Sequence, residues 1–71
     1  MDQAILAERL EQAEHHVAKG VRCIASQRTV VADLERNGQD TTLARALLAQ
    51  FQHTQVLHIA GRDELKKELE A

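Results

Sequence analysis

The side chains best suited to chemistry are four histidines and one cysteine. Metal sites in helical bundles often use a glutamate with a histidine three residues later on the same helix. Gln12 and Ala13 stand three residues before the first two histidines, so this motif is absent. His53 and His58 are five residues apart and point to different faces of a helix. Because the ligand sets are incomplete, the sequence predicts no metal site and no cofactor, and a histidine-based metal binder is kept only as a third alternative.

Cys23 is the only candidate nucleophile in the sequence. A catalytic thiolate needs a neighbouring base and a group that orients this base. His58 would lie near Cys23 in a helical hairpin, but nothing supplies the third group, and there is no glycine-rich phosphate loop. A short helical chain also offers no concave scaffold for a substrate. We therefore predict that the protein is not an enzyme, and that Cys23 is buried or lies at an interface.

Length and composition predict one small helical domain, 1–71, whose own core is too small to make it stable without further contacts. The 71 residues include no proline, one aromatic side chain and many strong helix formers. A chain of this size without disulfides or metal commonly depends on oligomerisation. The net charge of −2 provides no field that attracts nucleic acid or anionic membranes. Early charges argue against a signal peptide, and the lone thiol favours a reducing cytoplasm.

The helix start and stop signals in the sequence predict two helices joined by one turn. The expected elements are a helix over about 3–37, a turn at 38–41 and a helix over about 42–69. Asp2 can cap the first helix, and Gly38 can end it in the left-handed conformation. Asp40, Thr41 or Thr42 can cap the second helix. The sequence therefore predicts an all-α antiparallel helical hairpin.

A seam of side chains at steps of three and four predicts how the two helices meet. The predicted seam on the first helix is Leu10, Ala13, Val17, Gly20, Ile24, Gln27 and Val31. Its partner on the second helix is Leu47, Phe51, Thr54, His58, Gly61 and Leu65. A turn centred near residue 39 places Gly20 opposite His58 and Gln27 opposite Phe51. We expect His58 to form a neutral, hydrogen-bonded polar layer that fixes the register of the hairpin.

The second helix lacks charge around its whole circumference between residues 46 and 61. A helix of this kind is usually buried on more than one side, and exposed apolar patches usually mark an interface. The sequence therefore predicts a homodimer in which two hairpins form a four-helix bundle. The predicted interface consists of Val21, Cys23, Val30, Leu48, Gln52, Gln55 and Ile59.

A loose basic zone on the first helix leaves an alternative open. It consists of Lys19, Arg22, Arg28 and Arg36. Asp33 and Glu35 interrupt the zone, and no exposed aromatic side chain is available to stack on bases. A solvated charged face is the usual reading of such a zone. An RNA- or DNA-binding regulator remains the alternative to a protein-interaction role, and no membrane partner is expected.

The stretch LERNGQDTTLARALL, from Leu34 to Leu48, spans the turn and the start of the second helix. Together with ERLEQAEHHVAKG and QVLHIAGRDEL, it resembles a group of short proteobacterial two-helix proteins of unknown function. The resemblance covers nearly the whole chain, and it implies no activity, cofactor or catalytic residue. The functional expectation therefore rests on the residues themselves. They indicate a small non-enzymatic interaction or regulatory protein that acts as a homodimer, with another protein as a further possible partner.

Overall fold

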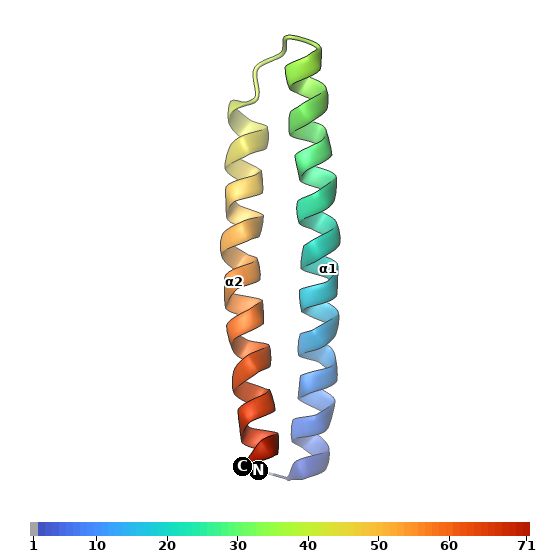
Figure 1. Ribbon diagram of the computed structural model, residues 1–71, viewed down its shortest axis with the longest axis vertical. Coiled ribbons are helices and arrows are strands. Elements are labelled where there is room, and N and C mark those ends of the chain that lie inside the picture. The colour runs from blue at the N-terminus through green and yellow to red at the C-terminus, as the bar shows by residue number, and fades with distance from the viewer. Residues whose placement is uncertain (1) are drawn as a thin grey trace.

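The computed structural model describes residues 2–71 and places them in two α-helices, α1 (Gln3–Arg36) and α2 (Thr42–Glu70). The helices lie side by side in opposite directions, and the start of α1 lies beside the end of α2, away from the turn (Figure 1). The resulting rod measures 54 × 14 × 13 Å. The all-helical class predicted from the sequence is confirmed, and the helix limits fall within one residue of those expected.

The ends of α1 form as the sequence predicts. The Asp2 carboxylate accepts a hydrogen bond of 3.0 Å from the backbone N–H of Ala4, which satisfies one free donor of the first turn. At the other end, Gly38 adopts a φ of 66°, a conformation open to glycine because it has no Cβ. The N–H of Gln39 then donates to the Leu34 carbonyl at 2.9 Å, so the last turn of α1 is closed by the backbone.

Asp40 organises the start of α2, although Thr41 occupies the N-cap position. One carboxylate oxygen of Asp40 accepts from the Thr42 N–H at 2.9 Å and from the Thr42 hydroxyl at 2.7 Å. These bonds, the one from the hydroxyl first, lower the pKa of Asp40 because they favour its ionised form. The Thr41 hydroxyl instead accepts from Arg45 Nε at 2.9 Å. Of the three residues predicted to cap α2, Asp40 therefore provides the side-chain cap.

The row of α2 that faces α1 differs from the predicted seam at every second position. Leu47, Thr54 and Gly61 are exposed, whereas Phe51, His58 and Leu65 are half-buried. In place of the three exposed residues, the row contains the residue that follows each of them, namely Leu48, Gln55 and Arg62. The prediction was wrong at these three positions because the apolar pattern of α2 fits more than one row, and the row that faces α1 includes the polar residues Gln55 and Arg62. Long polar side chains can cover an apolar seam with their stems.

The two helices are also displaced along their axis relative to the predicted layers. Gly20 faces Gln55 instead of His58, and Gln27 Nε2 donates to the carbonyl of Ala44 at 3.0 Å instead of lying opposite Phe51. The first difference is three residues, or about one helical turn, and the second is seven residues, or about two turns, part of which the long side chain of Gln27 spans. The physical reason is visible in the connection, because residues 37–41 run back along α1 and α2 begins below the level at which α1 ends (Figure 1).

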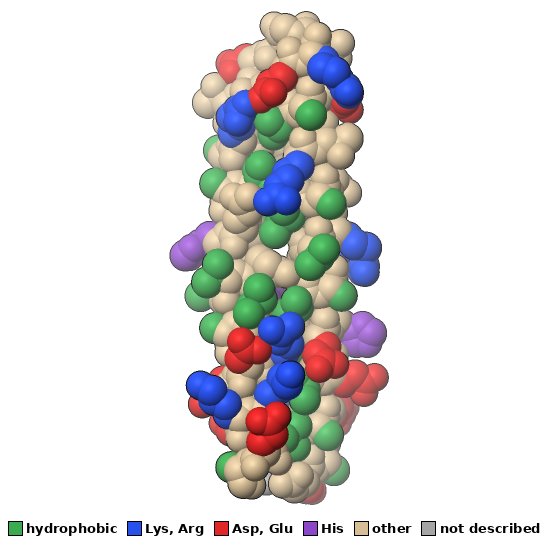
Figure 2. Space-filling model, in the orientation of Figure 1, with side chains coloured by type: hydrophobic (Ala, Val, Ile, Leu, Met, Phe, Trp, Pro, Cys, Tyr) green, Lys and Arg blue, Asp and Glu red, His purple; other side chains and the backbone are tan. Residues whose placement is uncertain are grey.

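The hairpin encloses very little core. Among the described residues only Leu6, Val31 and Gln55 are buried. Apolar side chains of both helices are visible along the middle of the face shown in Figure 2, where some cationic side chains also lie, while acidic side chains gather toward its two ends. Each helix therefore buries only part of the apolar surface of the other. In a single hairpin, much of that apolar surface is in contact with water.

Candidate functional site

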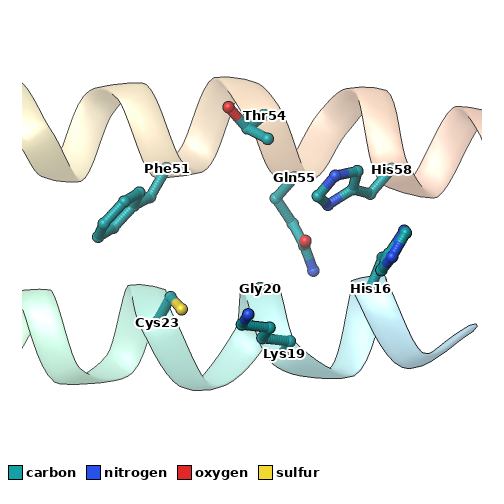
Figure 3. A pocket seen from close by; sticks show the side chains of 8 residues that line it. All are labelled: His16, Lys19, Gly20, Cys23, Phe51, Thr54, Gln55 and His58. Atoms are coloured by element: carbon teal, nitrogen blue, oxygen red, sulfur yellow. The ribbon is translucent and has the colours of Figure 1, made fainter. Parts of the chain in front are cut away.

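A cavity of about 300 Å³ opens between the helices near the middle of the rod, and it is the best candidate for a site (Figure 3). It is lined by His16, Lys19, Gly20, Cys23, Phe51, Thr54, Gln55 and His58. Both helices contribute, so the site exists only in the folded hairpin. We call the side of the hairpin onto which Cys23 and Thr54 project the cavity face, and the opposite side the closed face.

Gln55 crosses the space between the helices. Its Nε2 donates to the backbone carbonyl of Val17 at 2.8 Å, and the residue is only 7% exposed. The absence of a side chain at Gly20 makes room for it, since a Cβ on Gly20 would lie 2.6 Å from Gln55 Cδ. Its Oε1 is buried and has no hydrogen-bond partner among the described residues. Sequence reasoning placed Gln55 at a dimer interface and missed this role.

Two histidines meet at one end of the cavity. The ring centres of His16 on α1 and His58 on α2 are 5.4 Å apart, with 37° between the ring planes. His58 is half-buried, and its Nδ1 has no hydrogen-bond partner in the part of the chain that the structure describes. His58 thus faces α1 as predicted, but it lies opposite His16, and its Nδ1 does not take part in the hydrogen-bonded polar layer that we expected.

The other lining residues give the cavity a mixed character. Phe51 supplies an apolar wall, and Cys23 contributes a half-buried free thiol. Lys19 brings the only lysine or arginine side chain among the lining residues, and it is exposed. His16 and Lys19 precede Cys23 by seven and four residues, so the sequence could have indicated that the three share one side of α1, although not that a cavity lies there.

The residues predicted to form a dimer interface divide between the two faces. Val30 follows Cys23 by two turns and lies on the cavity face. At about 100° per residue, Val21 lies about 160° around α1 from Cys23, and Ile59 about 140° around α2 from Thr54. Both therefore belong to the closed face. Leu48 and Gln52 border that face as well, whereas Gln55 is buried in the hairpin.

The cationic side chains of the predicted basic zone do not gather on one surface. Lys19 and Arg28 are nine residues apart, which places them on opposite sides of α1. Arg36 forms an ion pair with Asp33 three residues before it. All four cations are exposed, including Arg22. The zone is a set of separate charges in the hairpin, not a continuous patch.

Residues 2–71 contain no group of three or more His, Cys, Asp or Glu side chains placed to hold a metal ion. Neither described helix is long and apolar enough to cross a membrane. Comparison of the chain with protein-family models, with curated proteins and with solved structures gives no match.

Proposed function

We propose that the protein is a small non-enzymatic interaction module that acts as a homodimer, with two hairpins packed through their closed faces into a four-helix bundle. The observation that carries the proposal is the apolar surface of this face. Val21, Val56 and Ile59 are 58%, 63% and 36% exposed. The α2 segment from 46 to 61 that supplies much of this face has no charged side chain. Surfaces of this kind usually form interfaces.

The energetics of the hairpin support the same conclusion. Ordering a residue costs about 1.5 kcal/mol of conformational entropy, and burial of apolar surface must offset this cost. Only three described residues are buried in the single hairpin, and one of them is a glutamine. A second copy would bury more apolar surface against the same helices, and two-fold dimers are the commonest closed assemblies.

The charges of the closed face favour an antiparallel arrangement in which α1 packs against α1 of the second copy. Glu14 and Arg28 lie seven residues before and after Val21, so all three project from nearly the same side of α1. A two-fold axis beside Val21 would place Arg28 of each copy next to Glu14 of the other. The turns of the two hairpins would then lie at opposite ends of the bundle.

The dimer is tested with charged substitutions on the closed face. In sedimentation equilibrium at micromolar concentration, the wild type should have about twice the chain mass of 7.9 kDa. Val56→Glu and Ile59→Glu should lower this mass and the helicity. Leu57→Glu is the matched control, because Leu57 is 60% exposed and lies about 100° further around α2 than Val56. A wild type that is a fully helical monomer would refute the dimer.

The antiparallel register is tested by exchanging charges. Arg28→Glu should weaken the dimer because it places two carboxylates side by side at each symmetric contact. Adding Glu14→Arg to the same chain should restore the wild-type dissociation constant, since the pairs re-form with reversed sign. Exposed pairs contribute about 0.2–1 kcal/mol each, so the expected change is several-fold. A double variant that dimerises no better than Arg28→Glu would contradict this register while leaving the dimer itself intact.

A further inference from the structure

The pairing of His16 with His58 places two metal-binding side chains from different helices beside each other. Their rings lie at one end of the cavity, next to Gln55 (Figure 3). The ring centres are 5.4 Å apart. Two imidazoles bound to one tetrahedral ion, each with a metal–nitrogen distance of about 2.0–2.1 Å, have ring centres about 5 Å apart. The two helices therefore hold the rings at nearly the separation that a shared ion requires.

Two polar atoms at this end of the cavity lack a hydrogen-bond partner among the described residues. His58 Nδ1 and Gln55 Oε1 are both buried without a hydrogen-bond partner among the described residues. Buried polar atoms normally have partners, because leaving them unpaired costs free energy. No protein hydrogen bond at Nδ1 fixes the orientation of the His58 ring, so the ring can turn to present either nitrogen. Gln55 Oε1 can accept a hydrogen bond from a water molecule on a bound ion.

We propose that His16 and His58 form a two-histidine clamp across the helices for a divalent transition-metal ion of the Zn²⁺ type. The described chain supplies two imidazole ligands, and water completes the coordination shell. Imidazole suits Zn²⁺, Cu²⁺ and Ni²⁺, whereas Mg²⁺ and Ca²⁺ prefer oxygen ligands. An ion bound to both helices would tie α1 to α2 in the folded state only. The proposal does not depend on the dimer, because both ligands belong to one hairpin.

Lys19 is the charged group of the cavity that opposes a cation. Its side chain is exposed and flexible, so its ammonium group can turn into solvent. Removing this charge with Lys19→Gln should tighten Zn²⁺ binding several-fold, because a like charge near the ion is lost.

The test is a Zn²⁺ titration of the whole chain at neutral pH, followed by thermal unfolding and calorimetry. At a Zn²⁺ concentration about ten times the Kd, the Tm of the wild type should rise by about 6–11 °C, and EDTA should reverse the rise. His16→Gln and His58→Gln should abolish this effect. His16 is exposed, so its replacement should leave the hairpin folded and keeps the test decisive if His58→Gln unfolds.

The chain offers its own matched controls. His15 and His53 are exposed and do not line the cavity, so His15→Gln with His53→Gln should keep the full Tm rise. Cys23→Ser should keep it as well. The proposal is overturned if Zn²⁺ does not raise the Tm of the wild type, if His16→Gln keeps the rise, or if any control abolishes it.

Discussion

Gly20 and Gly61 are both glycines in the interior of a helix, and the sequence pattern places both in the seam of the hairpin. The structure separates them. The side chain of Gln55 lies directly against Gly20, whereas a Cβ added to Gly61 would meet nothing within 4 Å. The same residue type is thus a packing requirement in the middle of α1 and only a helix-weakening residue in α2.

The difference arises from the row of α2 that faces α1. Since this row contains Gln55 and Arg62, Gly61 is turned toward the cavity face and stays exposed. Gln55 then uses the gap at Gly20 to reach the Val17 carbonyl. A glycine in a helical seam therefore indicates close approach only when the opposite helix presents a side chain long enough to fill the gap.

The largest expected effect comes from filling the gap at Gly20. Gly20→Leu should destabilise the fold by about 1–3 kcal/mol, because the new side chain would displace the buried amide of Gln55. Urea unfolding followed by circular dichroism measures this loss. Gly61→Leu is the matched control and should not be destabilising, since its site is open. Equal losses in the two variants would contradict the difference between the glycines.

A double-mutant cycle isolates the contact itself. Gly20→Ala alone should be neutral or destabilising, because its Cβ would lie 2.6 Å from Gln55 Cδ and would break the bond to Val17. In a Gln55→Ala background the clash is absent, so Gly20→Ala should stabilise the helix by about 1 kcal/mol. The coupling energy between the two sites should fall in the range of about 0.5–3 kcal/mol that contacting residues show. Additive effects would show that the two side chains do not touch.

Gly38 provides a third comparison, because its constraint is conformational and not steric. Its φ is +66°, and a Cβ there would meet nothing within 4 Å. Gly38→Ala should therefore destabilise by about 1–2 kcal/mol through backbone strain alone. Gly38→Asn should lose less, since asparagine tolerates this conformation better. Thermal unfolding of both variants checks the order, and a stable Gly38→Ala would contradict the left-handed turn.

Local signals predicted much of this fold, while contacts between the helices were predicted less well. Asp2 and Gly38 act within a few residues of their position, so their capping roles could be predicted from sequence alone. The seam of α2 could not, because the apolar pattern fits both Leu47 and Leu48. Gln55 favours the row that contains Leu48, because its Nε2 donates a hydrogen bond to the Val17 carbonyl on α1.

The cavity depends on the position of α2 relative to α1 along the axis of the hairpin. The sequences of the two helices do not determine this axial register. Residues 39–41 determine the axial position at which α2 begins. The prediction assumed a symmetric turn centred near residue 39, because this was the simplest connection. The observed displacement of about one turn brings His58 to His16 and Gln55 to Gly20. Without it, neither the histidine pair nor the cavity between them could be predicted.

The smallest expected effect is a gain at Gly61. Gly61→Ala should stabilise the protein by about 1 kcal/mol, because alanine loses less backbone entropy than glycine in a helix and the site is open. For a domain of this size the Tm should rise by about 4–8 °C. The closed-face dimer leaves Gly61 uncovered, so the gain should be the same at low and high protein concentration. A loss of stability that grows with protein concentration would mean that a second copy packs against the cavity face, and the assignment of the dimer to the closed face would then be wrong.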